Sequence, residues 1–199
     1  MVRTTVLAAS LAIAFTSAQA AEPLSVKVYN ADGNSFNVNS TLVVGAKEAM
    51  VIDAGFTRAD ALRIAANVLD SGKQLTTIYV SQADPDYYFG VETLKDIFPQ
   101  ADVVTTPDVL AKIKAKLAGK LAFWGPKMGT NAPRTPVLPR ALEGNTLALG
   151  GQTIEIRGTQ GPLAHRPYAW IPSIQAVVGN IGVFGGMHVW TADTQTAAE

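Results

Sequence analysis

The chain has 199 residues, of which 48% are hydrophobic and 16% charged, and its 16 basic residues balance its 16 acidic ones. This hydrophobic content excludes intrinsic disorder, and the absence of net charge or of an Arg-rich stripe argues against a nucleic-acid partner. The lack of cysteine excludes disulfides and thiolate metal ligands, and only two histidines, His165 and His188, are present.

The first 20 residues have the pattern of a secretory signal peptide. Arg3 supplies the positive charge, residues 6–15 form an apolar stretch too short to span a bilayer, and Ala18-Gln19-Ala20 is a small-x-small cleavage site. The alternative, a buried N-terminal helix, does not explain this combination. We therefore expect a periplasmic or secreted mature chain, a single domain over residues 21–199 with no membrane span.

The first half alternates predicted strands with predicted helices. Thr57 and Asp60 have the spacing of a capping box, and Pro107 suits a first helical position. Two continuous apolar runs are typical of strands buried on both faces. We expect strands at residues 24–29, 35–44, 49–53, 75–80 and 103–106, and helices at residues 57–71, 91–98 and 107–117.

The second half is mostly β. Residues 120–139 are rich in Pro and Gly and carry Phe123, Trp124 and Met128, so we expect a long ordered loop. A hairpin about Gly150-Gly151 should join residues 146–149 and 153–157, and strands should follow at residues 168–171 and 176–178. Together the two halves predict one α/β domain.

Residues 81–90, here called the acidic loop, lie between a buried strand and a helix, where ligands collect in α/β sheets. Asp84 and Asp86 flank Pro85, and two carboxylates so placed could bind a cation, Mg²⁺ or Ca²⁺ in preference to Zn²⁺. The structural alternative is that Asp84-Pro85 makes a turn and Asp86 caps the next helix.

The order AMVIDAG, a helix, LTTIYVS, DPDYYFG, a helix and VVTTP resembles the metallo-β-lactamase superfamily. That family's signature is a strand ending in Asp-x-Gly, a helix, a strand, then His-x-His-x-Asp-His and a glycine. The resemblance covers most of residues 43–184 and implies an αββα sandwich. We expect a fold shortened at its C-terminal end, because the chain stops before the segment that brings a last histidine ligand in the family.

The resemblance also implies roles for single residues. The motif's histidines fall on Gln82, Asp84 and Tyr87, and its aspartate on Asp86, so only the aspartate is kept. Further positions are implied around the motif. Asp53 matches the aspartate that supports the metal loop, His165 is the nearest match to a Gly-His ligand, Asn180 stands where the family has a bridging aspartate, and His188 matches no ligand.

Two functions follow from this resemblance. The first is a hydrolase of an ester, lactone or amide, in which Asp84, Asp86 and His165 hold one divalent ion, zinc or a harder ion. Asp86 and Tyr87 would be catalytic, and a second group would orient the substrate or support the site: Asp53, Gln82, Tyr88, Asn180 and His188.

The second function is a non-catalytic binding or scaffold protein without metal, which would use the aromatic residues Phe123-Trp124 and 168–170 as its surface. In that case His165 and His188 are ordinary packed histidines. A third hypothesis is a fragment with an incomplete fold. The sequence leaves the substrate and the oligomeric state open.

Overall fold

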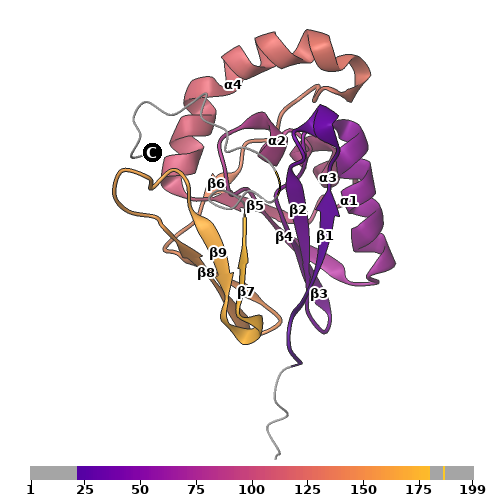
Figure 1. Ribbon diagram of the computed structural model, residues 1–199. Coiled ribbons are helices and arrows are strands. Elements are labelled where there is room, and N and C mark those ends of the chain that lie inside the picture. Colours follow the sequence, from indigo (N-terminus) through magenta and orange to yellow (C-terminus); the bar gives the residue numbers. More distant parts are fainter. Residues whose placement is uncertain (1–21, 180–185, 187–199) are drawn as a thin grey trace, which may run out of the picture.

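The computed structural model describes residues 22–179 and Gly186, so the predicted leader, Asn180 and His188 lie outside the described residues. Two β-sheets pack face to face, with helices on the far side of the larger sheet (Figure 1). The strands are β1 (Ser25–Asn30), β2 (Asn39–Val44), β3 (Glu48–Ile52), β4 (Gln74–Tyr79), β5 (Asp102–Thr105), β6 (Arg140–Ala141), β7 (Thr146–Leu149), β8 (Gln152–Arg157), β9 (Tyr168–Ile171) and β10 (Ala176–Val178). The helices are α1 (Arg58–Asp70), α2 (Pro85–Tyr88), α3 (Val91–Ile97) and α4 (Pro107–Met128), with 3-10 turns η1 (Gly33–Ser35), η2 (Gly129–Asn131) and η3 (Pro172–Ile174).

The six-stranded sheet has the order β1-β2-β3-β4-β5-β6. Its first three strands are antiparallel, and β3 to β6 are parallel. Side chains of β3 alternate between two cores: Ala49 and Val51 face the helices, whereas Met50 and Ile52 face the other sheet. The continuous apolar run is thus explained, and the prediction of a strand buried on both faces is confirmed.

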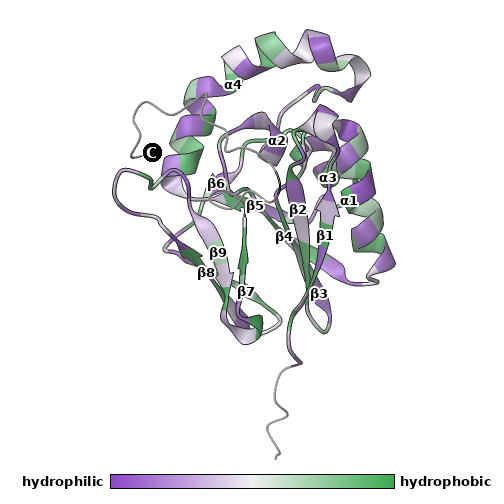
Figure 2. Cartoon of the chain, viewed as in Figure 1, coloured by the Kyte–Doolittle hydropathy of each residue, from purple (hydrophilic) through white to green (hydrophobic). Residues whose placement is uncertain are grey.

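Helices α1, α3 and α4 cover one face of this sheet and enclose the helix-side core, which includes Val51, Ile64 and Val109. The predicted capping box of α1 is confirmed, since Thr57 and Asp60 each accept a hydrogen bond from the other's backbone N–H, at 3.0 and 3.1 Å. Figure 2 shows alternating hydrophobic and hydrophilic stretches along α1 and α4, as expected of helices with one buried face.

The four-stranded sheet has the order β10-β9-β8-β7 and is antiparallel throughout. Its inner residues, among them Leu149, Ile154 and Ile171, form the inter-sheet core against Met50 and Ile52. The predicted β7–β8 hairpin is confirmed. Its turn needs glycine, because the φ angles of 57° and 78° at Gly150 and Gly151 are left-handed.

The loop predicted for residues 120–139 is wrong over its first half, because α4 continues to Met128. Leu117, Leu121, Trp124 and Met128 recur at helical spacing and pack against the helix-side core. Pro126 lies in the last turn of the helix, where the hydrogen bond it removes matters least. Across residues 22–179, no helix has both the length and the hydrophobicity to cross a bilayer.

The strand predicted for residues 35–44 is also too long. Asp32 caps the short turn η1 by accepting a hydrogen bond from the Asn34 N–H at 2.9 Å. Phe36 and Asn37 then adopt left-handed φ angles of 58° and 54°, so extended structure begins only at Asn39.

Candidate functional site

The acidic loop leaves the C-terminal end of β4 and lies beside the end of β3 (Figure 1). Two backbone hydrogen bonds join the loop to the end of β3: Ala54 N–H donates to the Tyr87 carbonyl at 2.8 Å, and Gly90 N–H donates to the Gly55 carbonyl at 3.0 Å. A Cβ on Gly90 would overlap the Ala54 carbonyl oxygen, so this approach requires glycine. The backbone therefore fixes the loop at the sheet edge where ligand sites form.

Asp53 holds the start of the acidic loop. Its carboxylate is buried and accepts hydrogen bonds from the Ser81 N–H and the Ser81 Oγ, both at 2.8 Å. Its own φ is 67°, a strained conformation that aspartate tolerates better than most residues. The Asp53 N–H donates to the Tyr79 carbonyl at 2.8 Å, and the Ser40 hydroxyl donates to the Asp53 carbonyl. Asp53 thus supports the loop from beneath it.

Burial also changes the protonation of the Asp53 carboxyl group. It raises the pKa of Asp53 to about 7; the hydrogen bonds from Ser81 oppose the rise, and the charge of Asp86 adds to it. At neutral pH the Asp53 carboxyl is therefore close to half-protonated.

Gln82, at the first histidine position, is buried and connects the acidic loop to the second half of the chain. Its Nε2 donates a hydrogen bond to the Pro167 carbonyl at 3.1 Å, just before β9 begins. The side chain therefore links two segments 85 residues apart in sequence.

Asp84 and Asp86 sit at the start of the short helix α2, beneath the long helix α4 (Figure 1). The idea that Asp86 caps the following helix is wrong: Asp86 lies within α2, and α3 begins after Gly90 without a side-chain cap. Asp84 instead forms an ion pair with α4, in which its Oδ1 lies 3.2 Å from the Lys120 Nζ. Both side chains are less than one-third exposed, at 31% and 27%.

The ionisable groups around Asp86 and Tyr87 alter the pKa values of these two side chains. Burial, followed by the charge of Asp84, raises the pKa of Asp86 to about 7, and Lys120 opposes the rise. Burial also raises the pKa of Tyr87, with Asp86, Asp53 and Asp84 adding to the rise and Arg166 opposing it. The Tyr87 phenol therefore stays protonated near neutral pH and is a poor metal ligand.

Tyr88 is buried in the helix-side core, where its ring packs edge-on against Phe89 at 5.2 Å between centroids. Burial, then Asp84 and Asp86, raises its pKa. Within the described residues, the Tyr88 hydroxyl has no hydrogen-bond partner. Its burial at the end of α2 makes it a supporting residue more than a substrate contact.

His165 lies in the segment before β9 and lines a groove of about 290 Å³ together with Asp108, Lys112 and Ala115 of α4. In the part of the chain that the structure describes, no three His, Asp or Glu side chains gather as a metal-binding group. Asp84, Asp86 and His165 are therefore not brought together as three ligands.

The donor set does not fit the zinc pair typical of the family. Such a site needs several imidazole and carboxylate ligands around a bridging hydroxide. Here the Gln82 amide donates a hydrogen bond to the Pro167 carbonyl, and the Asp84 carboxylate forms an ion pair with the Lys120 ammonium. The Tyr87 phenol stays protonated. None of the three side chains is therefore a ready metal ligand.

The aromatic residues predicted as a binding surface differ from one another in burial and contacts. Trp124 packs edge-on against Phe36 and Phe56, with centroid distances of 5.4 and 5.3 Å, and so belongs to the packing of α4. Phe123 is exposed. Trp170 is half-buried and receives the Arg157 guanidinium at 5.1 Å from its ring centroid.

The sequence predicts no individual role for three residues of the site: Ser81, Lys120 and Arg166. Ser81 directly follows a predicted buried strand, and this position was the available signal. Lys120 falls in the predicted loop, although the spacing of Leu117, Leu121 and Trp124 indicates that the helix continues through it. Nothing in the local sequence marks Arg166.

Comparisons with known proteins agree with this geometry. The sequence model of the family described as the metallo-beta-lactamase superfamily matches residues 33–172. No curated protein sequence matches the chain.

Solved structures with similar folds are metallo-β-lactamases. One from Pontibacter korlensis is 16% identical, with a TM-score of 0.54 over 81% of this chain and 68% of that chain. The BLEG-1 B3 metallo-β-lactamase is 16% identical, with a TM-score of 0.56 over 77% of this chain and 70% of that chain. The DIM-1 metallo-β-lactamase is 17% identical, with a TM-score of 0.54 over 81% of this chain and 66% of that chain. These likenesses establish the fold, and the family match spans most of the chain: the protein belongs to the metallo-β-lactamase superfamily.

Proposed function

We propose that this protein is an exported binding protein that keeps the fold of the superfamily and recognises a small polar molecule at the acidic loop without the family's metal pair. The ion pair between Lys120 and Asp84 carries the proposal. It supplies a positive charge from the protein itself at the position of a metal-ligating histidine in the motif.

The neighbouring groups suit binding better than hydrolysis. A metal-dependent hydrolase needs an ion that lowers the pKa of a bound water to near neutrality. An ammonium group cannot ligate water in this way. It does offer hydrogen-bond donors to a polar ligand.

A mononuclear metal hydrolase is the second candidate, and one observation favours it. The charge of Asp84 raises the pKa of Asp86, so the two carboxylates at the start of α2 lie close enough to repel each other. A hard divalent ion would relieve that repulsion, with Asp84 and Asp86 as oxygen ligands.

Metal analysis of the purified mature chain separates the two candidates. We expect the wild type and the control variant Lys114→Ala to hold far less than one ion per chain. Lys114 is an exposed residue of the same helix. Lys120→Ala should bind Zn²⁺ or Mg²⁺ more tightly than the wild type by calorimetry, because it frees the Asp84 carboxylate.

Stoichiometric metal in the wild type that is lost in Asp86→Ala, with metal-dependent cleavage of p-nitrophenyl acetate or a γ-lactone, would establish the hydrolase instead. Binding itself is tested with a fragment library followed by ¹H–¹⁵N NMR. We expect shifts concentrated at residues 81–90; a library that never perturbs these amides would refute a binding role there.

Export is tested separately. We expect the full-length chain to appear in the periplasm or medium of expressing bacterial cells, with its N-terminus at residue 21. A chain lacking residues 1–20 should stay in the cytoplasm. Retention of the full-length chain in the cytoplasm would exclude export.

A further inference from the structure

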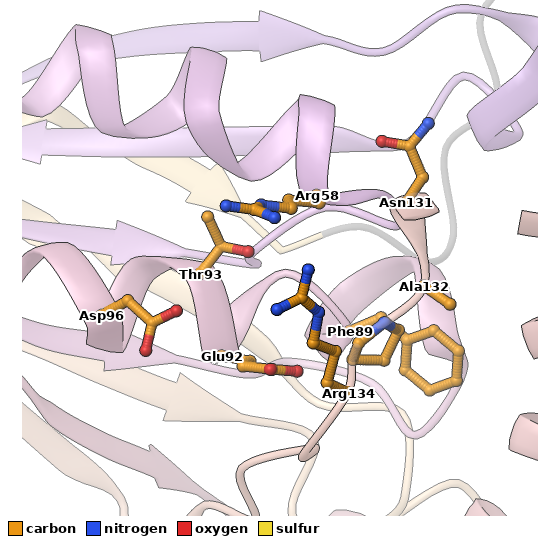
Figure 3. A pocket seen from close by; sticks show the side chains of 9 residues that line it. Arg58, Phe89, Glu92, Thr93, Asp96, Asn131, Ala132 and Arg134 are labelled. Carbon is orange, nitrogen blue, oxygen red and sulfur yellow. The ribbon is translucent and has the colours of Figure 1, made fainter. Parts of the chain in front are cut away.

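We propose a second binding site, for a phosphate group that carries a proton, in a pocket between α1, α3 and the segment after α4. The pocket has a volume of about 60 Å³. Figure 3 shows its polar lining: Arg58 at the start of α1, Glu92, Thr93 and Asp96 on α3, and Arg134 after η2. None of these five polar residues belongs to the acidic loop, which contributes only Phe89 to the lining.

Two guanidinium groups supply the attraction. Figure 3 shows the Arg58 and Arg134 side chains entering the same space from opposite walls. Among the described residues, neither has a hydrogen-bond or ion-pair partner in the protein. Two cations that face one space repel each other, and an anion between them turns this repulsion into attraction. Arginine suits this role because its planar fork of donors matches phosphate oxygens.

Two carboxylates determine which anion fits. Glu92 is held in place, since its Oε2 accepts a hydrogen bond from the Thr135 N–H at 3.0 Å, and Asp96 lies one helical turn further along α3. A carboxylate beside a fully ionised anion is repulsive. A phosphate group, whose second pKa is about 6, still carries a proton in part of the population near neutral pH and can donate it to a carboxylate. Sulfate has no such proton, so the pocket should reject it.

The size of the pocket agrees with one tetrahedral group. Its volume of about 60 Å³ is several times the ~10–15 Å³ that one water needs. Arg58, Asp96 and Arg134 are exposed, so any substituent on the phosphate can extend into solvent. Free phosphate and a phosphate monoester therefore share the recognised chemistry.

Calorimetric titration of the mature chain at neutral pH and low ionic strength tests the proposal, with sodium phosphate, phenyl phosphate and sodium sulfate as probes. We expect saturable binding of the two phosphate probes and binding of sulfate weaker by about tenfold or more, because sulfate has no proton to donate to the carboxylates and is repelled by them. The tighter of the two phosphate probes identifies the source as the free ion or a monoester.

Variants assign the binding to this pocket. Arg58→Gln combined with Arg134→Gln should abolish binding of both phosphate probes, whereas Lys114→Gln, which also removes an exposed positive charge, should not. Asp96→Asn should bring sulfate affinity close to that of phosphate. These residues are on the surface, and circular dichroism will confirm that each variant is folded.

Three results would overturn the proposal. The first is no saturable phosphate binding by the wild type, and the second is unchanged phosphate binding in the double arginine variant. The third is equal affinity of the wild type for sulfate and phosphate, which would leave only general attraction between ions.

Discussion

Asp53 combines a left-handed backbone with a buried carboxyl group, and each property is linked to the acidic loop through Ser81. Its pKa is about 7 in the folded protein, against an ordinary value of 3.8. Between these values the folded state holds a proton that the unfolded state has released. The free energy of unfolding should therefore fall as pH rises from about 4 to about 7.

We expect urea unfolding at a series of pH values to show this fall in the wild type. Asp53→Asn should flatten the fall, because an amide does not titrate. Asp86 also contributes to the fall in unfolding free energy, since its pKa is also about 7. Asp86→Asn should therefore remove a further part of the pH dependence. An Asp53→Asn variant with the wild-type pH dependence would show that Asp53 ionises normally.

Gly90 and Gly119 make a matched pair of glycines with opposite expectations. Gly90→Ala places a Cβ against the Ala54 carbonyl oxygen and the Ala61 side chain. We expect a loss of more than about 2 kcal/mol of unfolding free energy, in line with other overpacked positions. Gly119 lies in α4, and apart from its chain neighbours and the backbone of its own helix no heavy atom lies within 4 Å of the position of a Cβ.

Gly119→Ala should therefore stabilise the protein by roughly 0.5–1 kcal/mol, through the higher helix propensity of alanine. Chemical denaturation of the two variants measures both effects. A stable Gly90→Ala variant would mean that the acidic loop does not approach β3 as closely as described.

Helix α4 is the element whose extent was predicted least well. Gly125 and Pro126 favour a loop, because glycine and proline are the usual interrupters of helices. The apolar spacing of Leu117, Leu121 and Trp124 outweighs them, since these side chains gain a place against the helix-side core. Local propensity and tertiary packing conflict here, and only the folded chain reveals which one prevails.

Elements with a strong local signal were predicted well. The α1 capping box needs only Thr57 and Asp60, and β3 needs only its continuous apolar run. The same distinction applies to the candidate site. Asp53 and the acidic loop could be located from motif spacing, whereas the partner of Asp84 is Lys120 of α4, 36 residues away in sequence. No local pattern specifies such a contact.

Neighbouring aromatic residues of α4 test its packing. Trp124 is half-buried and contacts Phe36 and Phe56. Trp124→Ala should therefore lower the free energy of unfolding by somewhat less than the ~3–5 kcal/mol typical of a fully buried tryptophan. Phe123 is 55% exposed, so Phe123→Ala should cost much less. Thermal unfolding of the two variants gives the comparison. Equal losses would indicate that Trp124 does not attach α4 to the core.

At the scale of the whole molecule, the two cores share β3. Ala49 and Val51 belong to the helix-side core, and Met50 and Ile52 to the inter-sheet core. Neither core can lose this strand without damage to the other. We expect residues 21–199 to unfold in one cooperative transition, with coincident curves from far-UV circular dichroism and tryptophan fluorescence. Separate transitions would favour the hypothesis of a fragment with an incomplete fold.

Gly90, which brings the acidic loop against β3, has a consequence for protein engineering. The shape of the loop depends on Gly90, Asp53 and Ser81, whereas the motif's histidine positions belong to Gln82, Asp84 and Tyr87. Framework and chemistry are thus carried by different residues, and one framework residue, Asp53, lies outside the loop at the end of β3. The loop can be treated as an exchangeable cassette, in which new ligands are introduced at three positions while the three that set its path are left untouched.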